Sequence, residues 1–243
     1  MANTYFSFKE FTVHQSQCAM KVSTDACLFG AVVADFFYSH SQGPSKVLDI
    51  GTGTGLLTLM LAQKNPKANF LAIELDEDAA TQASRNVQES PWSNRVEVIQ
   101  QDVLSWSESS LEKFDLIICN PPFFSHHLLS ENKNRAMARH DESLSLPQLV
   151  AIATRCMSEQ AYFAILLPHI RMESCIELFQ KSFHLVYCLE SSDKIGKAPN
   201  RFIGIFSNAK AKSPTKYLQM ALHELNGQRT AVWNDLISAY YLH

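Results

Sequence analysis

From Ser45 onward, short apolar runs rich in β-branched residues alternate with longer segments whose apolar residues recur at helical spacing. This alternation predicts βα units around a parallel sheet, because the helices that connect parallel strands cover the faces of the sheet. Seven strands are expected, at residues 46–50, 69–74, 95–100, 115–119, 162–167, 184–189 and 202–206. Helices are expected at residues 56–63, 77–88, 146–157 and 172–181. The fold class is therefore α/β, with a mostly parallel seven-stranded sheet and helices on both faces.

The first 44 residues follow a different pattern. Phe6, Phe8 and Phe11 fall near an alternating pattern, and residues 22–38 then have helical spacing, with a cap at Thr24 or Asp25. The polar, turn-forming segment 39–45 is too short for a flexible linker between independent domains. We expect a single domain in which residues 1–44 form an N-terminal lid over the carboxyl edge of the sheet and residues 45–243 form the core.

Composition restricts the functional classes. The chain has 243 residues, of which 46% are hydrophobic, and this is enough to bury one sizeable core. A formal net charge of −3 gives no global positive field, so an RNA partner would have to meet a local basic patch. Six scattered cysteines form no CxxC pair, which argues against a zinc site and against a secreted disulfide framework. With neither a signal peptide nor a membrane-spanning apolar run, the sequence predicts a cytoplasmic protein.

The first expected strand leads into an acidic residue and a glycine loop. Asp49 precedes Gly51, Gly53 and Gly55, which are spaced as G-x-G-x-G, whereas a dinucleotide-binding loop has G-x-G-x-x-G. Glycines let the backbone approach a ligand closely. An acid at this place would repel a pyrophosphate, but it suits the ammonium and sulfonium groups of S-adenosylmethionine. We interpret the loop as an S-adenosylmethionine site, with a nicotinamide dehydrogenase as a weaker alternative.

Two further acids stand at strand ends. Glu74 ends the second expected strand, where a carboxylate can accept hydrogen bonds from both ribose hydroxyls. Asp102 follows the third strand, at a position suited to accept a hydrogen bond from the adenine amino group of the cofactor. Acids are common at strand ends, but together with Asp49 these two predict an adenosine-binding edge.

The fourth expected strand runs directly into Asn120, Pro121, Pro122 and Phe123, which we name the clamp. Two consecutive prolines lack N–H donors and fix φ, so they cannot continue a strand and they hold a rigid turn. The Asn120 side-chain oxygen and the Pro121 carbonyl can accept hydrogen bonds from the two N–H groups of a planar amine. These hydrogen bonds would free the lone pair of the amine nitrogen. Phe123 offers a ring face for a base that is turned out of its stack. The clamp predicts methylation of a planar amino nitrogen without a strong general base.

The N-terminal sequence is more specific about the substrate. Residues 8–15 (FKEFTVHQ) and 18–25 (CAMKVSTD) resemble the F-K-x-F-x-V-x-Q and C-A-M-K-V-x-T-D signature of the enzymes that N6-methylate the adenine beside the anticodon of valine tRNA. The stretches 88–92 (QESPW), 138–140 (ARH) and 239–242 (AYYL) match this family too, so the resemblance covers nearly the whole chain. Two positions depart from the family: Phe123 and His140 stand where tyrosine is common.

This resemblance implies a class-I, Rossmann-like methyltransferase fold and S-adenosylmethionine as the cofactor, without a metal ion. It also implies N6-methylation of adenine at position 37 by family convention, in the anticodon loop of valine tRNA, and we expect a monomer. By position, Lys21, Thr24 and Asp25 would border the methionine end of the cofactor. Gln15 would contact either the substrate base or only the backbone.

Basic residues gather in two segments that we expect on the substrate side, where they would contact RNA phosphates. One segment contains Lys194, Lys197, Arg201, Lys210, Lys212 and Lys216. The other follows the clamp and contains Lys133, Arg135 and Arg139.

Three alternatives stay open: N5-methylation of a protein glutamine, an rRNA or DNA amino-methyltransferase, and a non-enzymatic RNA-binding module. Protein-glutamine enzymes usually carry a helical N-terminal domain, and the aromatic leader stands in its place here. The intact glycine loop, strand-end acids and clamp argue against a loss of catalysis.

Overall fold

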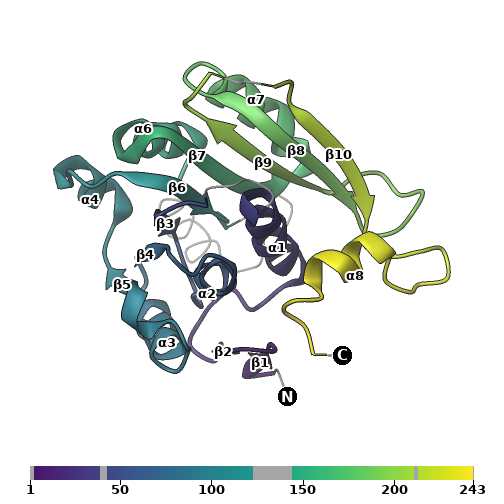
Figure 1. Ribbon diagram of the computed structural model, residues 1–243, viewed down its shortest axis with the longest axis horizontal. Coiled ribbons are helices and arrows are strands. Elements are labelled where there is room, and N and C mark those ends of the chain that lie inside the picture. The colour runs from purple at the N-terminus through teal and green to yellow at the C-terminus, as the bar shows by residue number, and fades with distance from the viewer. Residues whose placement is uncertain (1–2, 39–42, 123–143, 211–212, 243) are drawn as a thin grey trace, which may run out of the picture.

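The computed structural model describes residues 3–38, 43–122, 144–210 and 213–242. At its centre is a sheet of eight described strands in the order β10-β8-β9-β7-β6-β3-β4-β5 (Figure 1). All neighbouring strands of this sheet run parallel except β9, which is antiparallel to both β7 and β8. The strands are β3 (Lys46–Ile50), β4 (Asn69–Glu74), β5 (Val96–Gln100), β6 (Phe114–Cys119), β7 (Met157–Pro168), β8 (His184–Ser192), β9 (Arg201–Ser207) and β10 (Lys216–Ala221).

Helices cover both faces of this sheet, as the pattern predicts. One hydrophobic cluster lies under α1 (Thr24–Tyr38), α2 (Leu56–Lys64), α3 (Glu77–Gln88) and α8 (Ala231–Ile237). A second cluster lies on the other face under α4 (Val103–Ser109), α6 (Leu146–Cys156) and α7 (Met172–Phe179). No helix in the described part of the chain is both long and apolar enough to cross a membrane.

Strand β10 corrects the expected number of seven strands. It pairs in parallel with β8 at the edge of the sheet, and all of its residues are exposed or half-buried. An edge strand without a buried face needs no alternation of apolar and polar residues, so the pattern gave no signal for it. Helices α4 and α8 and the N-terminal hairpin were not predicted either. The seven predicted strands are all present, several of them longer than expected.

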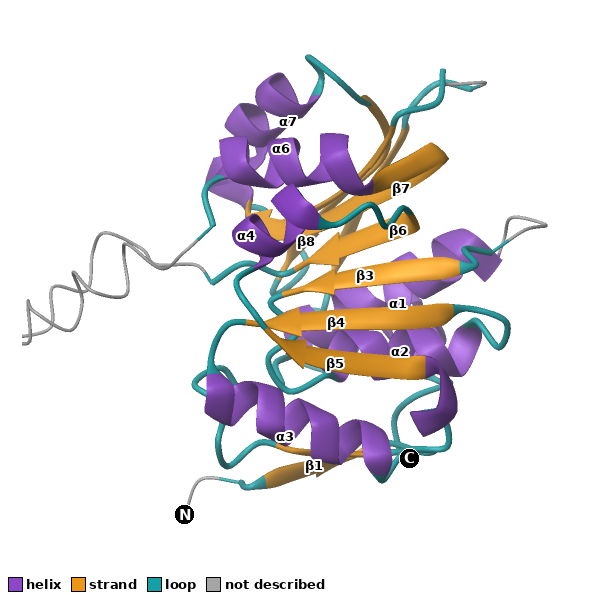
Figure 2. Cartoon of the chain, turned by 90° about the vertical axis from the view of Figure 1, so that its left-hand side faces the viewer, coloured by secondary structure: helices purple, strands orange, loops and turns teal. Residues whose placement is uncertain are grey.

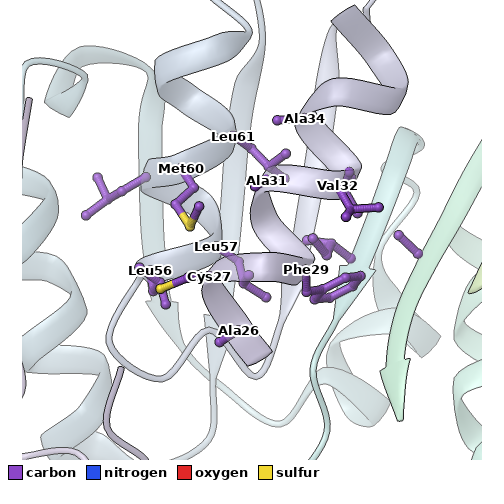
Figure 3. Packing of buried hydrophobic residues seen from close by; sticks show 14 of the residues in the cluster. Ala26, Cys27, Phe29, Ala31, Val32, Ala34, Leu56, Leu57, Met60 and Leu61 are labelled. Atoms are coloured by element: carbon purple, nitrogen blue, oxygen red, sulfur yellow. The ribbon is translucent and has the colours of Figure 1, made fainter. Parts of the chain in front are cut away.

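The helix of the leader lies on a face of the sheet and not over its edge. Figure 3 shows α1 packed against α2, and a Cβ atom added at Gly30 would come within 2.8 Å of the Met60 sulfur. The N-cap also differs from the expected Thr24 or Asp25, because the Ser23 hydroxyl accepts a hydrogen bond from the Ala26 N–H at 3.2 Å. Thr24 is instead the first residue of the helix.

The first part of the leader forms an antiparallel hairpin of β1 (Tyr5–Ser7) and β2 (Thr12–His14). This hairpin lies beside α3 and the C-terminal segment (Figure 1). Phe11 packs edge-on against Trp92, and Phe8 forms a bridge with Tyr241. The start of α1 approaches the carboxyl edge of the sheet, where Asp25 contacts Arg201 at the beginning of β9. A lid formed by the rest of the leader stays a prediction.

Candidate active site

The glycine loop and the clamp meet at the carboxyl edge of the sheet. Strand β3 lies between β4 and β6, and Ile50 is opposite Ile73 on one side and Cys119 on the other. Gly51 and Asn120 therefore leave neighbouring strands side by side. Figure 2 shows the arrowheads of β3, β4 and β6 on the same side of the molecule. Open α/β sheets bind their ligands at this edge.

Asp49 is fully buried beneath the glycine loop. Its Oδ2 accepts hydrogen bonds from the Thr52 and Thr58 hydroxyls, both at 2.7 Å, whereas its Oδ1 has no partner among the described residues. The pKa of this carboxyl is raised to about 6, mainly by burial and also by the charge of Glu74. The hydrogen bonds from the two hydroxyls act in the opposite direction and lower the pKa. A buried acceptor without a partner is costly, so the site favours a ligand that brings positive charge or a donor.

The three glycines of the loop all have positive φ: +67° at Gly51, +57° at Gly53 and +82° at Gly55. Other residues adopt this conformation only with strain. A Cβ atom at Gly51 or Gly53 would meet nothing within 4 Å, so these two residues face open space, which we name the cradle. At Gly55 it would touch Ala83 of α3, so the third glycine lets the loop lie against that helix.

Glu74 holds the loop in place at the end of β4. Its Oε2 accepts a hydrogen bond from the Gly53 N–H at 2.8 Å. Its Oε1 accepts hydrogen bonds from the Leu75 and Asp76 N–H groups at 2.9 and 3.1 Å. A carboxylate has about four acceptor sites, so Oε2 keeps one for a further donor. Contact of Glu74 with both ribose hydroxyls stays a prediction.

Asp102 is the N-cap of α4. Its side chain accepts hydrogen bonds from the Leu104 N–H at 3.0 Å and from the Ser105 hydroxyl at 2.8 Å. Partial burial raises the pKa of this carboxyl, but the hydrogen bonds from Ser105 and the backbone outweigh it and hold the pKa below its ordinary value. Capping accounts for these contacts, and a contact of Asp102 with adenine stays a prediction.

Asn120 presents a buried acceptor at the end of β6. Its Oδ1 is buried and makes no hydrogen bond to any residue that the structure describes. Pro121 is buried and Pro122 is exposed, so the turn begins inside the protein and ends at its surface. Phe123 and His140 lie outside the described residues, as does the whole segment 123–143.

The remaining leader residues contact the protein itself. Asp25 accepts a hydrogen bond at Oδ2 from the Arg201 Nε at 2.7 Å. Gln15 is buried; its Oε1 accepts from the Val22 N–H at 2.8 Å and its Nε2 donates to a backbone carbonyl at 3.0 Å. These two contacts are with backbone groups of the leader, and a contact of Gln15 with the substrate base stays a prediction. Lys21 is exposed, and cofactor contacts of Lys21, Thr24 and Asp25 stay predictions.

Sequence analysis missed Asn86, which is fully buried on α3. Its Nδ2 donates to the carbonyls of Thr54 and His14, both at 2.8 Å, and its Oδ1 accepts from the His14 N–H at 2.9 Å. Asn86 thereby joins the glycine loop to β2. The available signal was helical spacing, which places this amide on the same face as Ala79 and Ala83.

The structure divides the basic segment near the C-terminus. Lys194, Lys197 and Arg201 lie in or directly after the connection from β8 to β9, at the carboxyl edge. Lys210 follows the end of β9 and Lys216 begins β10, so both lie at the opposite edge. The expectation that the whole segment faces the substrate is wrong for these two. The others lie outside the described residues: Lys133, Arg135, Arg139 and Lys212.

Comparisons with known proteins agree with this arrangement. Residues 32–144 match the family model of the methyltransferase small domain. The chain is similar to the tRNA1(Val) (adenine(37)-N6)-methyltransferase of Bacteroides thetaiotaomicron, with 38% identity over 100% of this chain and 99% of the relative. Proteins with the same description from Glaesserella parasuis and Haemophilus influenzae are each 36% identical, over 98% of this chain and 97% and 98% of their own lengths.

Solved structures share the fold. A predicted O-methyltransferase from Agrobacterium tumefaciens aligns with a TM-score of 0.68 and 18% identity, over 90% of this chain and 98% of its own. A SAM-dependent methyltransferase from the same organism aligns with a TM-score of 0.59 and 15% identity, over 86% and 72%. The fold is that of the class-I methyltransferases, and the full-length similarity is more specific. The chain belongs to the family of tRNA1(Val) (adenine(37)-N6)-methyltransferases.

Proposed function

We propose that this protein transfers a methyl group from S-adenosylmethionine to N6 of the adenine at position 37 of valine tRNA. One observation carries the proposal: the buried Asn120 Oδ1 has no partner among the described residues. Asn120 directly follows β6, the strand next to the one that carries Asp49 and leads into the cradle. The names of the full-length relatives specify the same reaction.

The residues at the edge fit the cofactor. The cradle at Gly51 and Gly53 leaves room for it, and the Asp49 Oδ1, which has no partner among the described residues, suits a group that carries positive charge. The remaining acceptor site on Glu74 suits a ribose hydroxyl. When bound, S-adenosylmethionine supplies an electrophilic methyl group.

The clamp prepares the adenine amine for the reaction. The lone pair of this amine is delocalised into the ring, so the nitrogen is planar and a poor nucleophile. Asn120 Oδ1 and the Pro121 carbonyl accept hydrogen bonds from its two N–H groups. These hydrogen bonds favour a pyramidal nitrogen with a free lone pair. The rigid Pro121–Pro122 turn fixes this geometry before the substrate arrives. No strong general base and no metal ion are needed.

A base in an anticodon loop is a substrate that a single-domain protein of this size can reach. A base outside a duplex costs less to extrude than a paired base, so no separate domain is needed to open a helix. We also propose that the protein acts as a monomer in the cytoplasm, where its tRNA substrate is processed.

The variant Asn120→Ala tests the clamp. We expect methyl transfer to fall by about 100-fold or more, comparable to the loss of one preorganised catalytic hydrogen-bond partner. Cofactor affinity should stay within about twofold, because Asn120 contacts only the substrate amine. Asn94→Ala is the matched control, since Asn94 is exposed and precedes β5 at the opposite edge. Wild-type activity in Asn120→Ala contradicts the mechanism.

Substrate identity is tested separately with purified protein and labelled cofactor. We expect label in unmodified valine tRNA and none in duplex DNA. Mass spectrometry of the digested tRNA should then find N6-methyladenosine. Label only in rRNA or in a peptide contradicts the proposed substrate and leaves methyl transfer in place.

A further inference from the structure

Arg201 is the first residue of β9 and stands at the same edge of the sheet as the clamp. It lies opposite Pro168 at the end of β7, and β7 is the parallel neighbour of β6, which leads into Asn120. Two strand spacings separate β9 from β6, a lateral distance of roughly 10 Å. Arg201 is therefore beside the substrate position and on the side away from the glycine loop.

The guanidinium of Arg201 is held from two sides. Its Nε donates to Asp25 Oδ2 at 2.7 Å, and its Nη1 donates to the Asn200 carbonyl at 3.0 Å. The Arg201 side chain is 30% exposed, and no described residue hydrogen-bonds to its Nη2. The guanidinium is thus held in one orientation and still has free N–H donors. Such an arginine is preorganised to bind an oxyanion through two hydrogen bonds.

The connection before Arg201 is held firmly as well. The Asn200 N–H donates to the Ser191 carbonyl at 2.8 Å, and the Asn200 amide donates to Asp193 at 2.8 Å. The Ile195 N–H donates to the His223 carbonyl in the connection that follows β10. These bonds fix the connection before any ligand binds, so its cations need little ordering on binding.

The charged groups of this connection are only partly paired, and its Asp193 carboxylate is hydrogen-bonded to the neutral Asn200 amide. Asp25 pairs with Arg201, and Glu190 pairs with His169 at 2.6 Å. Lys194 is half-buried and Lys197 is exposed, and neither forms an ion pair with the residues that the structure describes.

We propose that Arg201 binds a phosphate of the substrate RNA beside the methylated base, with Lys194 and Lys197 extending the contact along the strand. Asp25 is then a positioning residue that orients the guanidinium. The inference rests on the proposed function, because it takes RNA as the substrate. It assigns the phosphate contact to this connection and excludes the basic residues at the opposite edge.

The test measures tRNA affinity of the full chain at several salt concentrations. For Arg201→Gln we expect affinity to fall about tenfold and the slope of log K against log salt to flatten by about 1. KM for tRNA should rise at an unchanged kcat. Lys210→Gln and Lys216→Gln remove the same charge at the opposite edge and should leave all of these values at the wild-type level.

A second variant separates RNA contact from damage to the ion pair. In Asp25→Asn/Arg201→Gln no carboxylate is left without its partner, and tRNA binding should stay as weak as in Arg201→Gln. The inference is overturned if the double variant regains wild-type affinity. It is also overturned if Arg201→Gln keeps the wild-type slope, or weakens only cofactor binding, while the wild type methylates tRNA. A wild-type protein that neither binds nor methylates tRNA refutes the proposed function itself.

Discussion

We expect Asp49 to make cofactor binding depend on pH. Burial raises the pKa of its carboxyl to about 6, whereas S-adenosylmethionine carries positive charge and binds better to the ionised form. We expect the affinity for the cofactor to rise with pH through about 6 and to level off above it. Below that value the loss approaches tenfold per pH unit, because a single proton is involved. Calorimetric titrations between pH 5 and 8 measure this.

The same pKa also fixes the sign of a stability effect. An unfolded aspartate has a pKa of about 3.9, so the folded protein without cofactor holds the proton more tightly. The contribution of Asp49 to folding is therefore fully present below about pH 4 and is lost as pH rises through the folded pKa of about 6. Asp49→Asn should bind the cofactor weakly and without this pH dependence. A variant that keeps the wild-type pH profile contradicts the assignment to Asp49.

Residues at strand ends were predictable, and their internal partners were not. Asp49, Glu74 and Asn120 follow from the order of strands, because parallel strands bring their carboxyl ends to one edge. The pair of Asp25 and Arg201 joins residues 176 positions apart, and no local pattern contains it. A resemblance to a family therefore located Asp25 but could not name the side chain that it contacts.

At the scale of elements, α3 connects the leader to the glycine loop through Asn86. Asn86→Ala leaves the backbone groups of His14 and the Thr54 carbonyl without their partner. Each buried polar group left unpaired costs about 1–3 kcal/mol. We expect a lower free energy of unfolding and a higher KM for S-adenosylmethionine, with a smaller effect on KM for tRNA. Urea unfolding and initial rates measure these quantities.

The matched control on the same helix is Gln88→Ala, because Gln88 is exposed near the end of α3. It should change neither the stability nor KM for the cofactor. Equal changes of KM for both substrates in Asn86→Ala would show that the loop is not held through this residue.

Elements with a buried face were predicted, and elements without one were missed. Strands β3 and β4 have continuous or nearly continuous buried runs, and their bounds agree with the pattern to the residue. Strand β10 is exposed or half-buried throughout. Helices α4 and α8 have 7 residues each, and so few positions hardly define a helical period.

At the scale of the whole molecule, the C-terminal segment that contains Tyr240 contacts both the N-terminal hairpin and helix α2. The Tyr240 ring is buried, with 1% exposure, and its hydroxyl donates to the Met60 carbonyl on α2 at 3.2 Å. Its backbone carbonyl accepts a hydrogen bond from the Lys9 N–H at 2.8 Å. The Gln63 side chain donates to the adjacent Ala239 carbonyl at 2.8 Å. No local sequence pattern shows that the two ends of the chain lie side by side.

Tyr240→Ala should therefore weaken the whole fold and loosen the hairpin first. We expect the free energy of unfolding to fall by about 3–5 kcal/mol, the usual cost of removing a buried aromatic ring. Tyr240→Phe keeps the ring and loses one hydrogen bond, so it should cost only about 1 kcal/mol. Hydrogen exchange should report lost protection at the Lys9 and Gln15 amides, while β3 and β6 stay protected. A loss below about 1 kcal/mol in Tyr240→Ala would mean that the hairpin is held without this ring.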